Sequence, residues 1–130
     1  MSRARPHPTD AELQLLRVLW TRGPSTVREV HESLGPESTT AYTTSLKLLQ
    51  NLHGKGLVAR DESSRQHIYR ATGGEASTVQ GVVRHLIDRS FEGSAASLAM
   101  HALGAKRTSP EELSRLKALI AELEKRERRR

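Results

Sequence analysis

The chain has 130 residues, no cysteine, 3% aromatic residues and a formal net charge of +6. This length suits one ordinary domain, or a small domain with an appended assembly segment. The lack of cysteine excludes disulfides, thiol catalysis and thiolate metal sites, and it fits a cytoplasmic protein. No apolar run approaches the roughly 20 residues of a membrane span, and no signal peptide is recognisable. Residues 1–8 contain Arg3, Arg5 and two prolines, and this composition predicts a loose basic arm.

The basic charge is distributed unevenly along the chain. Residues 1–75 carry ten Lys or Arg and eight Asp or Glu, whereas residues 125–130 alone carry five cations and one anion. The net charge is therefore largely a property of the C-terminal tail. A terminal charge run is more often a solvated end than a specific site, so this charge by itself does not indicate nucleic-acid binding by the folded part.

Two capped helices are predicted near the N-terminus. Thr9 with Glu12, and Thr26 with Glu29, each form a capping box, in which each side chain can bond the other residue's backbone amide. Behind each box runs an apolar stripe that ends at a Gly-Pro pair. The stripes are Leu13, Leu16 and Trp20, thickened by Leu15 and Leu19, before Gly23-Pro24, and Val27, Val30 and Leu34 before Gly35-Pro36.

The segment 39–72 predicts a third helix followed by a hairpin. The helix begins at the Ser38-Thr39-Thr40 cluster, any member of which is a suitable N-cap, and it ends at Gly54 and Gly56 around Lys55. Residues 57–60 and 67–70 are compatible with strands on either side of a polar turn. Three helices and a hairpin in this order predict a winged helix-turn-helix, mainly α with a small β-hairpin.

The third helix has two different faces. Tyr42, Leu46, Leu49 and Leu52 form an apolar stripe, which predicts that they face the core. The opposite face carries hydroxyls, amides and one cation, and no Asp or Glu occurs between Glu37 and Asp61. A face that donates hydrogen bonds and repels no anion suits a DNA groove, although a lone helix of this kind is more often a solvated surface. The opposite face comprises Thr40, Thr43, Thr44, Lys47, Gln50 and Asn51.

Three further helices are predicted over residues 77–91, 95–103 and from Pro110 onward, the last with Ser109 as its cap. A short and a long helix cannot bury their apolar stripes alone. A narrow leucine-rich seam at heptad-like spacing favours pairing with a second copy over packing within the chain. The residues predicted to form this dimer contact are Phe91, Leu98, Leu103, Leu113, Leu116, Ile120 and Leu123. We therefore expect a DNA-binding domain in residues 1–74 and a helical dimerisation region in residues 75–130.

Several motifs of the chain match those of a known family. They are Thr26-Val27-Arg28-Glu29-Val30, Lys55-Gly56-Leu57-Val58, Arg65, Tyr69 and, most specific of all, Ala41-Tyr42-Thr43-Thr44. In these motifs the chain resembles the penicillinase-repressor (BlaI/MecI) family of bacterial winged-helix repressors. The resemblance implies a homodimer that binds an inverted-repeat operator and blocks transcription. It also implies that the third helix enters the major groove while the hairpin touches the flanking backbone.

The chain departs from the family pattern at several positions. Ser45 stands where the family usually has an aliphatic residue, Lys47 where threonine is common, and Asn51 where arginine is frequent. These changes bear on the operator sequence and not on the binding mode. In the best-known members an Asn-Phe bond is cut to induce, but the corresponding place here is His101-Ala102. We therefore do not extend that protease-controlled switch to this chain.

The expected DNA contacts fall into two groups. Side chains on the outer face of the third helix are expected to meet base edges in the major groove, with Lys47 and Asn51 as the main readers. Hydroxyls at helix starts and cations nearby are expected to contact phosphates. The expected groove contacts are Thr43, Thr44, Lys47 and Asn51. The expected phosphate contacts are Thr26, Arg28, Ser38, Thr39, Thr40 and Arg65.

No catalytic, metal or cofactor site is predicted, and the chain is not expected to be an enzyme. His31-Glu32 begins like a zinc-protease motif, but Gly35 stands where the second histidine belongs. An alternative function remains, in which the winged helix is an assembly module whose third helix meets protein. Exposed aromatics or acids would be expected on such a helix, and Thr43, Thr44, Lys47 and Asn51 do not fit that description.

Overall fold

The computed structural model describes residues 7–130, so the arm predicted at residues 1–8 lies outside the described residues except for His7 and Pro8. The chain divides into two compact units, Met1–Leu86 and Ile87–Arg130. The change of unit falls inside a helix, at a different place from the domain boundary expected after residue 74. That boundary remains a prediction.

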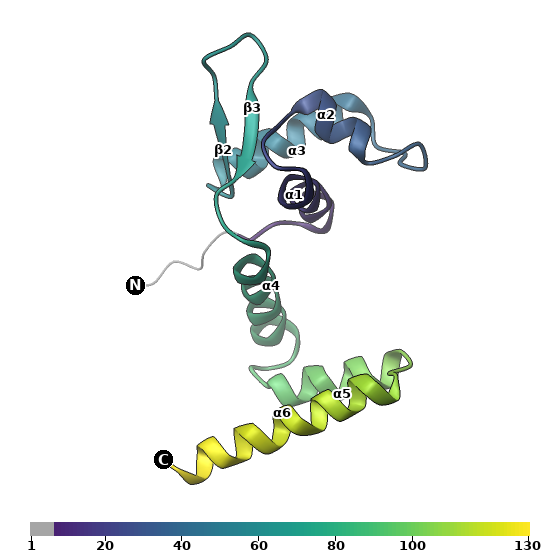
Figure 1. The fold of residues 1–130 in the computed structure, drawn as a ribbon, viewed down its shortest axis with the longest axis vertical. Helices are drawn as coiled ribbons and strands as arrows, with labels where there is room; N and C mark the ends of the chain where they lie inside the picture. The colour runs from purple at the N-terminus through teal and green to yellow at the C-terminus, as the bar shows by residue number, and fades with distance from the viewer. Residues whose placement is uncertain (1–6) are drawn as a thin grey trace. The chain divides into compact units, whose positions relative to one another are not determined.

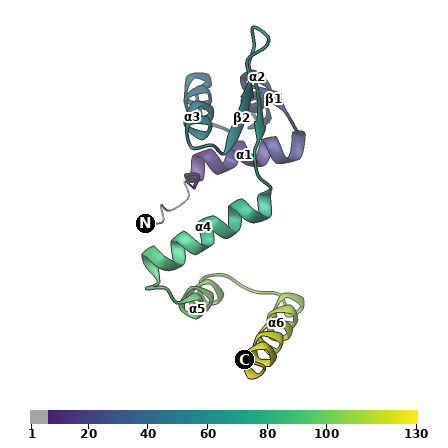
Figure 2. The same cartoon turned by 90° about the vertical axis from the view of Figure 1, so that its left-hand side faces the viewer.

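The first unit contains the elements expected of a winged helix-turn-helix (Figure 1). Three helices come first and a hairpin follows them, and the tip of the hairpin extends beyond the helices (Figure 2). The predicted strands are each displaced by one residue. The elements in chain order are α1 (Asp10–Arg22), β1 (Ser25–Thr26), α2 (Val27–Ser33), α3 (Tyr42–Gly54), β2 (Val58–Asp61), β3 (Ile68–Ala71) and the start of α4 (Glu75–Ser90).

Both predicted capping boxes are confirmed. The Thr9 hydroxyl accepts from the Glu12 amide at 3.2 Å, and the Thr9 amide donates to Glu12 Oε1 at 2.9 Å. Thr26 and Glu29 make the same pair of bonds at 3.2 and 2.9 Å. The Thr26 backbone amide, and then the Arg22 guanidinium, lower the pKa of the Glu29 carboxyl, because both stabilise its charged form. The second box thus fixes where α2 begins.

The predicted start of the third helix is wrong. The N-cap of α3 is Ala41, and no side chain of the described residues caps it. The Ser38 hydroxyl instead accepts from the Thr40 amide at 3.2 Å, which closes a local turn before the helix. Hydroxyls that bond neighbouring backbone in this way compete with a capping role. The left-handed glycine expected near the helix end is confirmed at Gly56, whose φ is 78°.

The sheet has a third strand that the sequence did not predict. The described residues form an antiparallel sheet of order β1-β3-β2, in which Ser25 pairs with Tyr69 and Val58 pairs with Ala71. A strand of only two residues is too short to show alternation. Its pairing with β3 joins the start of α2 directly to the hairpin.

The core of the first unit is small and comes mostly from the predicted stripes. Its main departure from prediction is Tyr42, which is 44% exposed although it was expected in the core. The buried Ser45 occupies a core-facing position of α3. The buried apolar residues are Leu15, Leu16, Leu19, Val30, Leu49, Leu52, Val58 and Tyr69.

The buried carboxylate of Glu12 joins the start of α1 to the end of α3. Glu12 is 2% exposed, and its Oε1 lies 2.5 Å from Lys55 Nζ at the end of α3. Lys55 Nζ also donates to the His7 carbonyl at 3.1 Å. The Lys55 ammonium is therefore engaged in contacts inside the unit.

The second unit contains α5 (Ala95–Ala105) and α6 (Pro110–Arg128), which follow the end of α4 (Figure 2). Ser94 and Ser109 cap these two helices through hydrogen bonds to Ser97 and Glu112, and Pro110 is the first residue of α6 as predicted. In the described part of the chain, α4, α5 and α6 bury no residue. None of the described helices is both long and apolar enough to cross a membrane.

We predict that Lys55→Met lowers the free energy of unfolding by about 2–3 kcal/mol. Breaking a fully buried pair costs roughly 3–5 kcal/mol, and Lys55 is 30% exposed, which reduces the loss. Denaturant unfolding of the full chain measures the change. Lys47→Met is the matched control, since Lys47 is exposed and should shift stability by about 0.5 kcal/mol or less. Equal effects of the two substitutions would contradict a stabilising role for the pair.

Candidate nucleic-acid interface

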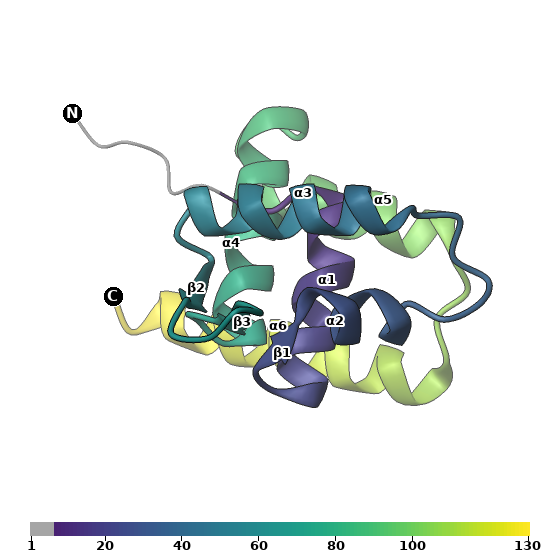
Figure 3. The ribbon, with the colours of Figure 1, turned by 90° about the horizontal axis from the view of Figure 1, so that it is seen from above.

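A groove lies between α3 and the elements that the sheet holds beside it. The start of α2 and the hairpin are on the same side of α3 (Figure 3). One ridge of α3 forms the facing wall, with Tyr42, Leu46 and Gln50 at successive turns. The residues that line the groove from the other side are Thr26, Val27, Arg28, Arg60, Arg65, Gln66, His67 and Tyr69.

The groove is cationic. Arg28 comes from the start of α2, while Arg60 and Arg65 come from the hairpin. Among the described residues that line it, none is acidic. Walls that carry one sign of charge focus the electrostatic potential, so a polyanion is the ligand that this groove favours.

Three of the predicted phosphate contacts are brought together here. Thr26, Arg28 and Arg65 all line the groove although they lie far apart in sequence. Arg28 and Arg65 are exposed, whereas Thr26 also serves as the cap of α2. The Ser38-Thr39-Thr40 cluster is in the loop before α3 and is absent from the described lining.

The predicted base readers are all exposed, but they do not point the same way. At about 100° per residue, Thr43 and Lys47 follow the outward side of α3 next to the groove ridge, while Thr44 and Asn51 fall on the far flank. Gln50 is both exposed and part of the groove lining. The geometry therefore favours Thr43, Lys47 and Gln50 over Asn51 as the residues nearest the groove on the outward face of α3.

Tyr42 is held at the groove by a contact to α2. Its ring lies edge-on to His31, with ring centroids 5.5 Å apart, and His31 Nδ1 lies 2.8 Å from the Ser45 hydroxyl. Ser45 is completely buried, so this hydrogen bond satisfies a polar group that would otherwise be costly. Ser45, which departs from the family pattern, is thus paired with His31, and their hydrogen bond links α2 to α3.

Arg60 is a groove residue that sequence reasoning missed. Its Nε is buried without a hydrogen-bond partner among the described residues, and its Nη2 lies 3.4 Å from Glu62 Oε1. The Tyr69 hydroxyl beside it is the main cause that raises the pKa of the guanidinium, so Arg60 stays charged. Arg60 is paired with Tyr69 across the sheet, and no local sequence signal indicates this register.

The hairpin turn is shaped by a second carboxylate. Asp61 Oδ1 accepts from the Ser63 amide at 2.9 Å, and this backbone hydrogen bond lowers the pKa of Asp61.

Within residues 7–130, no group of three or more His, Cys, Asp or Glu side chains is placed to hold a metal ion.

Three helices, a hairpin and a cationic groove beside the third helix define a winged helix-turn-helix protein. A sequence model of the family described as penicillinase repressor matches residues 8–122. The chain belongs to the penicillinase repressor family.

Similar proteins agree with this membership. The chain is 35% identical over 117 residues to the transcriptional regulator BlaI of Mycobacterium tuberculosis, which covers 88% of this chain and 83% of the relative. It is 25% identical over 117 residues to the penicillinase repressor of Bacillus licheniformis, which covers 90% of this chain and 91% of that one.

A solved structure supports the fold alone. The crystal structure of the YusO protein from Bacillus subtilis matches with a TM-score of 0.53 at 20% identity, over 91% of this chain and 75% of that one.

We predict that the His31 and Ser45 side chains are energetically coupled. Ser45→Ala should cost about 1–2 kcal/mol of stability, because His31 Nδ1 loses its partner. In a His31→Leu background the same substitution should cost at least about 0.5 kcal/mol less. Denaturant unfolding of the four proteins measures the coupling. Ser33→Ala, which removes an exposed helix hydroxyl, is the control. Additive effects would show that the contact contributes nothing.

Proposed function

We propose that this protein is a transcriptional repressor that binds operator DNA through α3 and the cationic groove beside it. The observation that carries the proposal is the groove itself, where three arginines and no described carboxylate line the wall opposite α3. Membership of the penicillinase repressor family supports the same function, since relatives over most of the chain are named as a transcriptional regulator and a repressor.

The residues divide into base readers and phosphate contacts. Lys47, Thr43 and Gln50 are proposed to meet base edges, since lysine and amide side chains can bond guanine and adenine in the major groove. Thr44 and Asn51, on the far flank of α3, are proposed to face the opposite wall of the DNA major groove. Phosphate contacts are proposed for Thr26, Arg28 and Arg65 from the lining, and for Ser38, Thr39 and Thr40 before α3.

The proposed repressor is a homodimer on an inverted-repeat operator. Among the described residues, none of α4, α5 or α6 is buried. Apolar side chains of these helices are exposed, and their contact with water is unfavourable. A second copy is the proposed cover. Of the proposed contact residues, Phe91, Leu98 and Leu116 are half-buried, while Leu103, Leu113, Ile120 and Leu123 are 41–56% exposed.

Binding to DNA from upstream of the protein's own gene tests this function. Footprinting of the full chain should show a protected region with two symmetric halves, and unrelated duplex DNA at the same salt should bind more weakly. Equal binding of both DNAs would favour an assembly module without specific readout. No binding of either would contradict the proposal.

Lys47→Ala and Arg65→Ala are predicted to fail in different ways. If Lys47 grips a base, its loss should cost about 1–3 kcal/mol on the operator and relax the preference at one position. Loss of Arg65 should weaken binding to all sequences alike. It should also reduce the slope of log affinity against log salt by about 0.9 for each phosphate that the arginine no longer neutralises. Titrations of both variants against operator and unrelated DNA at several salt concentrations measure these effects.

Arg70→Ala is the matched control for Arg65. Arg70 is an exposed arginine of the same hairpin, but it is not part of the groove lining. A slope that fell equally for both variants would indicate a diffuse charge effect, and an unchanged Arg65 variant would remove that residue from the site.

We predict that Ile120→Glu combined with Leu123→Glu converts the protein to a monomer. Each change places a charge on the apolar seam of α6, where burial against a second copy would be unfavourable. Operator binding should weaken, because two linked half-site contacts act at high effective concentration. Sedimentation at micromolar concentration measures the state. Ser114→Glu, on another face of α6, is the control and should leave the dimer intact. A monomeric wild-type protein would contradict the proposed dimer.

A further inference from the structure

The groove arginine Arg60 is engaged by an acid of its own hairpin. Its Nη2 lies 3.4 Å from Glu62 Oε1, and the same oxygen lies 3.9 Å from His67 Nε2. Arg60 and His67 both line the groove, whereas Glu62 does not. A single carboxylate therefore contacts two groove side chains from outside the lining.

The other carboxylate of the turn does not share this position. Asp61 accepts from the Ser63 amide, a bond that belongs to the turn. Among the close contacts between basic and acidic side chains of the described residues, those that include a groove residue both involve Glu62, and the one to His67 is an ion pair only when the imidazole is protonated. Neutralisation of the cationic groove in the free protein is thus concentrated at this residue.

The contact between Arg60 and Glu62 is one that a phosphate can replace. The Glu62 side chain is 56% exposed and that of Arg60 is 21% exposed, so the acid is solvated while the cation is held in the wall. Exposed ion pairs contribute little net stability. A phosphate presents oxygens to a guanidinium in the same way as a carboxylate does. A phosphodiester that enters the groove can therefore replace Glu62 at Nη2 at small cost.

We propose that Glu62 is an internal stand-in for a DNA phosphate, which holds Arg60 in the free protein and releases it to a phosphodiester of bound DNA. Glu62 thereby sets the strength of DNA binding without reading sequence. The inference rests on the proposed function and adds to it one phosphate-binding residue, Arg60, and one residue that opposes binding.

Glu62→Gln, Arg60→Gln and their combination test this exchange. The full-length proteins are titrated with operator and with unrelated duplex at one salt concentration. Glu62→Gln should bind both DNAs about two- to five-fold more tightly, the range that corresponds to one exposed ion pair. Arg60→Gln should bind both roughly ten-fold more weakly, as expected for loss of a charged hydrogen bond. In the Arg60→Gln background, Glu62→Gln should give no gain.

Two further variants keep the result interpretable. Asp61→Asn removes the neighbouring charge but retains an oxygen that can accept from Ser63, so it should change affinity less than Glu62→Gln does. Arg60→Lys keeps the charge if the glutamine variant does not fold, and the gain from Glu62→Gln should then be retained in part. Thermal unfolding of each variant identifies those that are folded.

The outcomes separate this inference from the function on which it rests. A Glu62→Gln gain of equal size with and without Arg60 would indicate general repulsion of DNA by the acid and would overturn the exchange. The absence of any gain would overturn it too. Wild-type protein that bound no operator would overturn the proposed function, and the inference with it.

Discussion

The arrangement of the first unit depends on the buried carboxylate of Glu12. One of its oxygens accepts from the Thr9 amide, which starts α1, and from Lys55 Nζ, which follows the end of α3. The loop from Lys55 turns at Gly56 and enters β2 directly. The ion pair therefore holds the end of α3, from which the chain continues into the hairpin, against the start of α1. In a small domain with a thin core, one satisfied buried charge has a large influence on the geometry.

The groove is built from elements that are tied together in a similar way. The two-residue strand β1 pairs with β3, and this pairing brings Arg28 at the start of α2 to the side of the hairpin that carries Arg60 and Arg65. The His31–Ser45 hydrogen bond fixes α2 against α3 from the other end. Arg28 and Arg60 thus stand on elements that are joined to their neighbours by backbone or buried polar bonds, which favours preformed positions for these two cations, whereas Arg65 lies in the exposed turn between β2 and β3.

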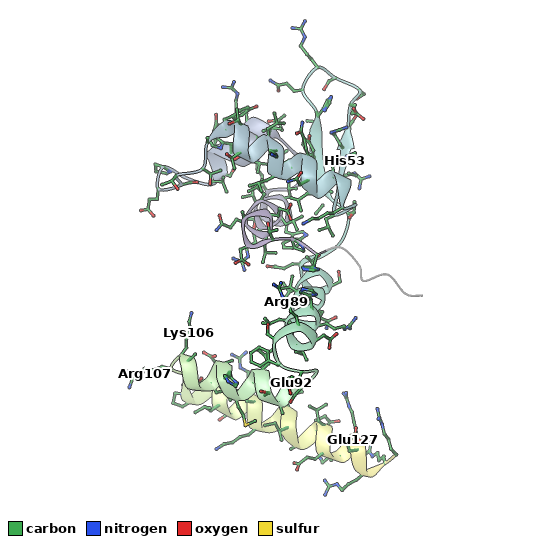
Figure 4. The ribbon with its side chains drawn as sticks, turned by 180° about the vertical axis from the view of Figure 1, so that it is seen from behind. His53, Arg89, Glu92, Lys106, Arg107 and Glu127 are labelled. Carbon is green, nitrogen blue, oxygen red and sulfur yellow. The ribbon has the colours of Figure 1, made fainter. Side chains whose placement is uncertain are left out.

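The charged side chains outside the first unit have a different setting. Lys106 and Arg107 extend from the loop between α5 and α6, and Glu127 belongs to the last turn of α6 (Figure 4). The basic residues at the end of α6 complement the helix dipole, which is sufficient reason for their presence there. The net charge of the chain is therefore a poor guide to its binding surface, and the cations that matter most for the proposed function lie in the first unit.

The sequence by itself determined the order of the helices and the hairpin, and where α1 and α2 begin. Capping boxes at Thr9 and Thr26 and the glycine at position 56 act through neighbouring residues, so local rules predict them correctly. The leucines of the core follow from helical periodicity for the same reason. The sequence also indicated the family, and with it Thr26, Arg28 and Arg65, whose place in one groove the structure then showed.

Only the tertiary structure decided which side chains share that groove. Tyr42 was assigned to the core by its spacing from Leu46, yet the contact to His31 leaves it half-exposed at the groove wall. Arg60 lies beside Tyr69 because of the sheet register, and Lys55 is engaged by Glu12, a residue 43 positions away. These relationships depend on pairings between distant segments, which helix and strand periodicity cannot encode.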